Sequence, residues 1–277
     1  MQISVFRRPA LLLASFLALT ACGTSYQLPV IDNAVASEAS AMFDTAQAAE
    51  TRSPASLQSG VNRFRRVARR IEPVARTLCE RELQNNSDVD CNVTLHIDTE
   101  MPVRNAYFSY GAPGYRNPEV HFTIPMLRDA ANDDEIAFIL GHEYGHLLGQ
   151  HIQKGDQQAL AGAILLGAIA AYGNAQAASA GQYYDPNDVT RAVHLGGALG
   201  QRAFSQTYEL ESDMLGARIA AAAGYDPVRG AQYFARGESA RSANGKLSFW
   251  GTHPPDEKRL AVVIATMEQI RQQQNQQ

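Results

Sequence analysis

The sequence predicts a mainly helical α+β protein with a small three-stranded sheet beside the helix that contains His142–His146. Two patterns support this fold class. Short segments rich in β-forming residues gather between residues 91 and 124, and capped helical patterns dominate the chain from residue 132 onward. The composition agrees, because 277 residues that are 45% hydrophobic and 19% charged can bury a sizeable core. The formal net charge is −4, which argues against a general binder of polyanions, so we expect no nucleic-acid partner.

The N-terminus is typical of an export signal. Arg7 and Arg8 precede a short apolar run, Ala10–Leu19, and small residues follow, which predicts a lipoprotein signal peptide over residues 1–21. The stretch Leu19–Cys22 resembles the bacterial lipobox, in which the chain is cleaved before the cysteine and the thiol is lipidated. Several acyl chains on Cys22 would anchor the protein stably. Because Gly23 follows the cysteine, enterobacterial sorting rules favour the outer membrane; the alternative is ordinary signal cleavage with an accidental cysteine.

Two cysteines remain after signal cleavage, Cys79 and Cys91. An even number of cysteines in an exported chain predicts a disulfide, and two free thiols are the alternative. Closing a loop of this size would stabilise the fold by about 3 kcal/mol in the chain-entropy description.

The domain prediction divides the mature chain into three parts. Residues 22–55 are expected to form a tether and N-terminal segment, with an Ala-rich stretch, Ala34–Glu50, that can be helical. Residues 56–272 are expected to form a single domain. Residues 273–277 are Gln-rich and are predicted to be a disordered tail.

The first long helical pattern runs over Val61–Gln84. Pro73 interrupts it, and proline is expected only near the start of a new helix. The segment also holds a cluster of five arginines, which either forms a solvated face or contacts anionic headgroups. These residues are Arg63, Arg65, Arg66, Arg69 and Arg70.

Three short strands are predicted next, at Cys91–Asp98, Arg104–Tyr110 and Glu119–Ile124. Between the second and third, Gly111–Gly114 has the composition of a turn. Three short strands make a small sheet and not a large β domain.

Helices are predicted for most of the remaining chain. Asn132–Glu135 resembles a capping box that opens a helix running to about His151, and a second long helix is expected over Ala203–Gly224. Two more are expected near Val228–Ser242 and Pro255–Gln272.

The apolar segment Ala159–Gly173 lies between the two long helices. We interpret it as a packed helix or a lid over the cleft. Contact with a membrane or a partner is the alternative.

The chemistry begins with His142-Glu143-Tyr144-Gly145-His146, an HExxH pattern on a predicted helix. Residues i and i+4 share one helix face, so both imidazoles can bind one zinc ion. Glu143 lies beside the first ligand, where it can take a proton from the water that the metal activates. A helix with two surface histidines is the alternative, and it leaves Gly141 unexplained.

Two histidines cannot hold catalytic zinc alone, so a third protein ligand is required. His151 follows His146 by five residues, one fewer than the metzincin spacing. Glu209 and Asp213 are also i and i+4 on a helix, whereas Glu211 points away from Glu209. Glu209 is therefore the better third ligand, and Asp213 is expected to orient a ligand histidine.

A third place is Gly251–Pro255, where His253 precedes two prolines. Taken alone, it is typical of a rigid structural loop.

The three places together resemble the gluzincin metallopeptidases of the HtpX and CaaX-prenyl-protease-1 type. The shared features are HExxH at 142–146, ExxxD at 209–213 and the late Thr252–Pro254. Within that family the chain is most similar to a periplasmic lipoprotein branch that includes LoiP and BepA. Asn105–Tyr107 and Gly224–Pro227 match further family patterns, so the resemblance covers roughly residues 105–260. Ser212 stands where alanine is usual, and Tyr110–Arg116 lengthens the segment between strands.

This resemblance implies a zincin-like core and a role for each matching residue. One zinc ion per chain would be held by His142, His146 and Glu209. Glu143 would be the general base, and Asp213 would support the ligands.

Two further roles are implied by the resemblance. His253 would either occupy the fourth position on zinc and shut the enzyme, or steady the oxyanion during catalysis. The strand Glu119–Ile124 would be the sheet edge that pairs with extended substrate backbone. Its residues are Glu119, Val120, His121, Phe122 and Thr123.

The expected function is a zinc endopeptidase that is lipid-anchored at the outer membrane and faces the periplasm. Its expected partners are unfolded or misassembled envelope proteins and, through the lipid anchor, the membrane. The competing interpretation is a chaperone-like assembly or binding factor with a latent zinc site. An exopeptidase would need a feature that recognises a chain terminus, and the sequence marks none.

Overall fold

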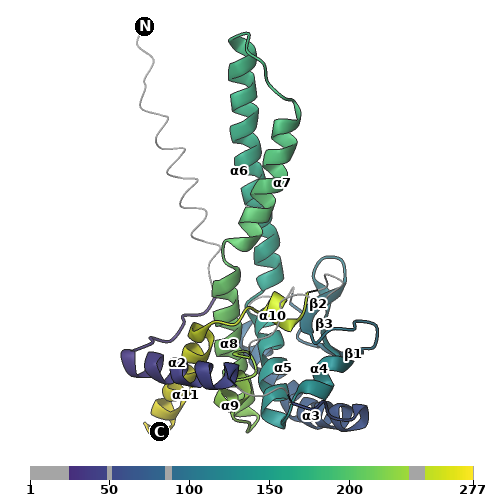
Figure 1. Cartoon of the computed structure of the whole chain (residues 1–277), viewed down its shortest axis with the longest axis vertical. Helices are drawn as coiled ribbons and strands as arrows, with labels where there is room; N and C mark the ends of the chain where they lie inside the picture. Colours follow the sequence, from purple (N-terminus) through teal and green to yellow (C-terminus); the bar gives the residue numbers. More distant parts are fainter. Residues whose placement is uncertain (1–24, 49–51, 85–88, 237–246, 277) are drawn as a thin grey trace. The chain divides into compact units, whose positions relative to one another are not determined.

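The computed structural model describes residues 25–48, 52–84, 89–236 and 247–276; its elements are labelled in Figure 1. The predicted signal peptide and the lipidation residue Cys22 lie outside the described residues. The chain divides into two compact units. The main unit comprises Tyr26–Gln150 and Tyr208–Gln277, and the hairpin unit comprises His151–Thr207 together with Ser25. The range 56–272, expected to be one domain, therefore contains an inserted helical unit.

The described chain confirms the expected fold class, since it is mainly helical with one three-stranded sheet. The helices of the main unit are α2 (Asn33–Gln47), α3 (Leu57–Glu82), α4 (Ile124–Asp129), α5 (Asp133–Leu148), α9 (Pro227–Ala231), α10 (Phe249–Thr252), α11 (Glu257–Gln274) and most of α8 (Ser205–Ala222). The predicted helix near 228–242 is only the five residues of α9 within the described chain. Two residues of the predicted disordered tail, Gln273 and Gln274, belong to α11.

The sheet contains β1 (Thr94–Asp98), β2 (Ala106–Ala112) and β3 (Arg116–Thr123) in the order β1-β3-β2. β1 pairs with β3 in parallel and β2 pairs with β3 antiparallel. The expectation that Glu119–Thr123 form a sheet edge is wrong. Because β3 is hydrogen-bonded on both sides, its backbone cannot accept another strand, and the free edges belong to β1 and β2.

Helix α3 runs through Pro73 without interruption, contrary to the expected break. Proline removes the hydrogen bond from position 73 to the carbonyl of Arg69. Both residues are exposed, so water can satisfy that carbonyl. Buried side chains at helical spacing, among them Phe64, Ile71 and Ala75, hold the helix on the core.

The disulfide prediction is confirmed. Cys79, buried on α3, is bonded to Cys91 just before β1, and their Cα atoms are 5.8 Å apart. The bond ties α3 to the start of the sheet.

The arginine cluster of α3 separates into two groups. Arg63 and Arg66 bind Asp133 at the start of α5, and Arg70 lies over the ring of Tyr225. Arg65 and Arg69 are the remaining members, and both are exposed. Four of the five arginines are exposed, so the cluster lies on a solvated face as expected, and three of its members also contact neighbouring elements of the main unit.

Helices α5 and α8 cross at positions without large side chains. A Cβ atom on Gly141 would lie 2.8 Å from the carbonyl oxygen of Gly216, and one on Gly145 would lie 2.8 Å from the Cα atom of Ser212. Glycine inside a helix costs about 0.5–1 kcal/mol relative to alanine. The close approach of the two backbones explains both α5 glycines and the small residue at position 212.

The hairpin unit is built from α6 (His151–Ser179) and α7 (Asn187–Arg202), which pack against each other. The expected segment Ala159–Gly173 is helical, but it is not the core of a packed unit. Most of its large side chains are exposed and its inner face contacts α7. By length and composition alone, α6 is the one helix among the described residues that is able to cross a membrane.

One stabilising ion cluster lies inside the main unit around Asp129. Its carboxylate accepts hydrogen bonds from Tyr233 at 2.7 Å and Arg236 at 2.7 Å, and Arg104 lies 3.2 Å away. Burial opposes ionisation, but these hydrogen bonds and charges hold the pKa of Asp129 below its usual value.

We expect Asp129→Asn to destabilise the protein by about 3–5 kcal/mol at pH 7, because the buried Arg236 and the partly exposed Arg104 lose their counter-charge. The folded-state pKa lies below the unfolded value of about 3.9, so the carboxylate contributes stability above that value. This contribution is lost as the pH falls through the folded-state pKa. Urea unfolding of both proteins between pH 7 and pH 3 measures it. A difference that stays constant over that range would contradict the assignment.

Candidate metal centre

The metal-binding helix α5 begins where the sequence predicts. Asn132 caps it by accepting a hydrogen bond from the backbone N–H of Glu135, and Glu135 in turn accepts from the N–H of Ala131. The helix ends at Leu148, and Gln150 with φ 53° breaks it before His151. His142 and His146 therefore lie one above the other on the α5 face that meets α8.

Four potential ligand atoms converge at this crossing. The Nε2 atoms of His142 and His146 are 3.1 Å apart, and the Glu209 carboxylate lies 3.4 Å from the first and 3.6 Å from the second. The Nδ1 atom of His253 lies 3.2 Å from His142 Nε2 and 2.8 Å from Glu209. All four atoms lie within 4.8 Å of one another.

This geometry fits a tetrahedral zinc ion. Zinc–nitrogen distances of about 2.0–2.1 Å place tetrahedral ligands roughly 3.3 Å apart. The separations between the His142, His146, Glu209 and His253 atoms scatter around that value. Three imidazoles and one carboxylate are also borderline ligands that suit zinc.

Asp213 fixes the orientation of His142. The Nδ1–H of His142 donates to Asp213 at 2.9 Å, since a carboxylate only accepts, and this leaves Nε2 free as a metal ligand. Asp213 in turn accepts two hydrogen bonds from Arg259, at 2.7 and 2.8 Å. Arg259 also lies 3.2 Å from Glu209, so it positions both carboxylates.

The charges around Glu209 keep it ionised. Burial raises its pKa, but the charges of His253 and Arg259 and the hydrogen bonds of the histidines hold that pKa well below its usual range. For His142, burial lowers the pKa, and the hydrogen bonds with Asp213 and Glu209 raise it to about 9. An anionic ligand and a proton-accepting imidazole are the forms that attract a divalent cation, so zinc and protons compete here.

Glu143 is a buried carboxylate with no hydrogen-bond partner among the described residues. Its Oε1 atom lies 3.5 Å from Nε2 of His253. Burial raises the pKa of Glu143, while the charges of His253 and His142 oppose the rise. A buried carboxylate that lacks a hydrogen-bond partner and lies beside a candidate metal site is placed to accept a proton from a water molecule.

His253 reaches the cluster because α10 is fixed to the sheet. The N–H of Phe249 donates to the carbonyl of Arg104 just before β2, and the hydroxyl of Thr252 donates to the side chain of Asn105. The N–H of His253 donates to Phe249 within α10, and the two rings are 4.8 Å apart. The position of His253 corresponds to a fourth zinc ligand, the first of the two roles left open by the sequence.

The structure brings together His142, Glu143, His146, Glu209, Asp213 and His253. His151 starts α6 in the hairpin unit, and Glu211 accepts a hydrogen bond from the N–H of Tyr26, so neither belongs to the cluster. Sequence reasoning missed Arg259 and the ring of Phe234, which packs against His142 and under Arg259. Arg259 follows His253 by six residues, a spacing that carries no helical or strand signal by itself.

We expect Asp213→Asn to weaken zinc binding by about 10–100-fold, because the neutral amide orients His142 poorly and leaves Arg259 without its counter-charge. Competition with a coloured zinc chelator gives the affinity. Glu257→Gln on the exposed start of α11 is the matched control and should bind zinc like the wild type. Equal affinities for all three proteins would exclude an orienting role for Asp213.

Comparison with known proteins agrees with this geometry. Residues 62–266 match peptidase family M48, which is well over half of the chain. The mitochondrial metalloendopeptidase OMA1 of Arabidopsis thaliana is 32% identical over 136 residues, which cover 48% of this chain and 24% of that protein. The chain thus spans about a quarter of the length of the relative it matches. On the family match and the zinc-type ligand cluster, the chain belongs to peptidase family M48 and is a zinc metallopeptidase.

Proposed function

We propose that this protein is a zinc endopeptidase of the bacterial periplasm that degrades unfolded or misassembled envelope proteins. The observation that carries the proposal is the buried Glu143 carboxylate, which has no hydrogen-bond partner among the described residues and lies beside the convergent ligand atoms of His142, His146 and Glu209. Amide hydrolysis of this kind requires a metal site, a general base, and buried side chains that hold the ligands and the base in a fixed orientation.

Zinc, when bound, would polarise the scissile carbonyl and make a water molecule more acidic. Glu143 accepts the proton of the attacking water at its carboxylate and passes it to the leaving amine. Asp213 keeps the Nδ1 proton of His142 in place throughout. Arg259 compensates the two carboxylates that flank the site, so their negative charge does not repel the developing oxyanion.

Substrate backbone is proposed to pair with β2, because its outer edge is free within the described sheet. β2 starts beside Asn105, and Asn105 accepts a hydrogen bond from Thr252, the residue before His253. A strand added to this edge would thus run next to the cluster. Main-chain pairing predicts loose side-chain specificity, which suits unfolded chains as substrates.

The location is proposed from the N-terminus. The lipobox-like Leu19–Cys22 and the following Gly23 support an anchor in the outer membrane, with the protein facing the periplasm as in the LoiP/BepA-like lipoproteins. Labelling cells with radioactive palmitate tests the anchor. Label on the wild type and none on Cys22→Ser is expected, with the wild type in the outer-membrane fraction; label that persists on Cys22→Ser would contradict it.

A second candidate is an assembly factor whose zinc site is latent. The position of His253 favours it, because a fourth protein ligand would leave no room for water or substrate. The two candidates are compatible if His253 withdraws when a substrate binds.

The deciding experiment incubates the zinc-loaded mature protein with an unfolded model protein and with its folded form. We expect cleavage at internal sites of the unfolded form, including in peptides blocked at both ends, and loss of cleavage on chelation. Absence of cleavage with zinc bound would favour the latent assembly factor. Cleavage only of peptides with free termini would indicate an exopeptidase.

A further inference from the structure

The α6–α7 hairpin has the opposite arrangement of side chains from a water-soluble helix pair. Small residues fill the contact between the helices: a Cβ atom on Gly162 would overlap the backbone of Gly196, and one on Gly200 would overlap the backbone of Gln158. A soluble pair buries its large apolar side chains at such a contact. Small residues inside and large apolar residues outside are typical of helices that pack within lipid.

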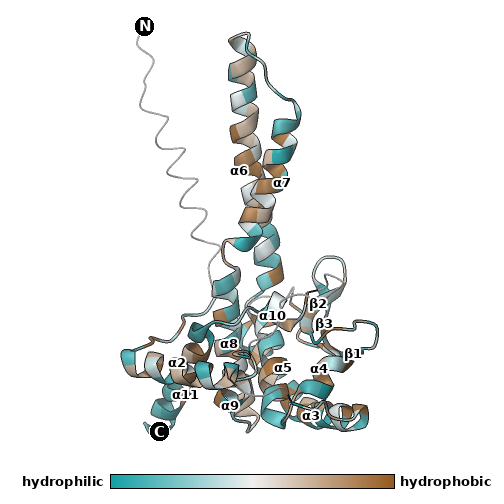
Figure 2. Ribbon diagram, in the orientation of Figure 1, coloured by the Kyte–Doolittle hydropathy of each residue, from teal (hydrophilic) through white to brown (hydrophobic). Residues whose placement is uncertain are grey.

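The outer surface of this hairpin is the largest concentration of exposed apolar side chains in the described chain. Leu160 and Ile164 are each 62% exposed, and Ile169 is 58% exposed. Figure 2 shows hydrophobic residues along the middle of α6 and on the adjoining part of α7. The further members are Leu165, Tyr172, Val193, Leu195 and Leu199.

No charged residue interrupts α6 beyond Asp156. Residues 157–184 contain no Asp, Glu, Lys or Arg. On α6 the exposed residues Leu160, Ile164, Ile169 and Tyr172 spread over about half of the helix circumference at roughly 100° per residue, so they form one broad apolar stripe. A contiguous apolar stripe of this kind is rarely left in contact with water.

We propose that the outer face of the α6–α7 hairpin inserts into the interfacial layer of a lipid bilayer, as a second membrane contact independent of Cys22. The stripe from Leu160 to Tyr172 covers 13 residues and is about 18 Å long, which is shorter than the roughly 30 Å hydrocarbon core. The hairpin is therefore suited to lying in one leaflet and not to spanning the membrane.

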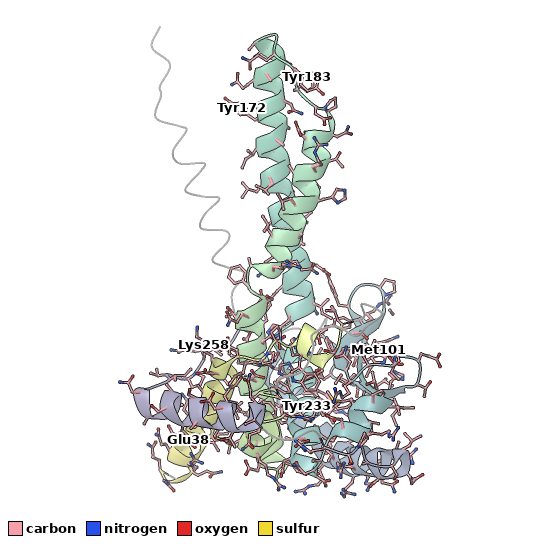
Figure 3. The ribbon with its side chains drawn as sticks, in the orientation of Figure 1. Glu38, Met101, Tyr172, Tyr183, Tyr233 and Lys258 are labelled. Atoms are coloured by element: carbon pink, nitrogen blue, oxygen red, sulfur yellow. A yellow bond between two sulfur atoms is a disulfide. The ribbon has the colours of Figure 1, made fainter. Side chains whose placement is uncertain are left out.

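The polar groups of the hairpin agree with this depth. Arg191 on α7 binds both Asp185 and Asp188 at 2.6 Å, so the charges beside the connection are paired with each other. Tyr172 and Tyr183 lie near that connection (Figure 3), and Tyr183 is 91% exposed. Tyrosines at the end of an apolar stripe favour the level of the headgroups.

The test uses the mature chain with Cys22→Ser, so that no acyl chain contributes, and vesicles of phosphatidylethanolamine and phosphatidylglycerol. We expect flotation with the vesicles. The triple variant Ile164→Gln, Leu165→Gln, Ile169→Gln should lower the partition coefficient at least about tenfold. All three side chains are exposed, so the fold should persist, which circular dichroism checks. Leu57→Gln, at a 46% exposed apolar position of α3, is the matched control and should float normally.

A second measurement does not depend on the triple variant. Tyr172→Trp should show a blue-shifted emission with vesicles and quenching by lipids brominated on the acyl chain, against the constant signal of the buried Trp250. Unchanged flotation of the triple variant, or an emission insensitive to vesicles, would overturn the proposal. A vesicle-free dimer that the triple variant makes monomeric would assign the stripe to a second copy instead. Cleavage of a soluble substrate should not change, so this result stands apart from the proposed peptidase activity.

Discussion

Glu143→Gln is expected to lower peptide-bond hydrolysis by about 10²–10⁴-fold. The amide keeps the size of the side chain but cannot accept the proton of the attacking water. Since Glu143 supplies none of the four candidate ligand atoms, the zinc content should remain near one ion per chain. Initial rates on an unfolded model protein, measured beside metal analysis of the same samples, give both quantities.

The matched control for this variant is Glu38→Gln on the exposed face of α2. It removes the same carboxylate chemistry far along the chain from the cluster and should keep wild-type activity. A loss of zinc from Glu143→Gln would show a structural defect. Equal activity of the two variants would remove Glu143 from the mechanism.

His253→Ala is expected to raise hydrolysis about tenfold if the arrangement with His253 Nδ1 beside His142 and Glu209 is the dominant resting state. When only a small fraction of the molecules has the open, active form of the site, the measured rate is reduced in proportion to that fraction. Removing the fourth ligand should make the open form dominant and so restore the full rate. The other three ligands should retain zinc, since three protein ligands suffice for a catalytic site.

The double variant Glu143→Gln, His253→Ala separates the possible sources of any gain. It should be inactive, because an opened site still needs its base. A fall in activity of His253→Ala with zinc retained would instead assign His253 to oxyanion stabilisation, the second role that the sequence left open.

The site was predictable where its signals are local. His142 and His146, and likewise Glu209 and Asp213, are four residues apart, so helical periodicity alone places each pair on one face. The cap at Asn132 is also local, and the structure contains it. The role of Arg259 could not be predicted, because Arg259 is 46 residues from Asp213 in the sequence and shares no periodic pattern with it.

The fold was less predictable where pairing is long-range. Strand propensity found all three strands, but propensity does not say which strand pairs with which, so β3 was taken as an edge when it is central. The ability of Pro73 to break the helix was overestimated. Proline removes one hydrogen bond, but the carbonyl that loses it is exposed to water, and the burial of Phe64 and Ile71 offsets the loss. The apolar stretch at 159–173 has the same composition whether its side chains face a core or the outside, so its exposure could not be foreseen.

The inserted hairpin unit has a consequence for how the chain can vary. The chain leaves the main unit at Gln150, four residues after His146, and returns at Tyr208, immediately before Glu209. Zinc held by these two residues would act as a reversible cross-link that closes the loop between them. Loop-closure entropy grows only logarithmically, so doubling the insertion would cost the main unit about 0.6 kcal/mol. The insertion can therefore lengthen, shorten or change sequence while the ligand residues that precede and follow it in the chain stay the same.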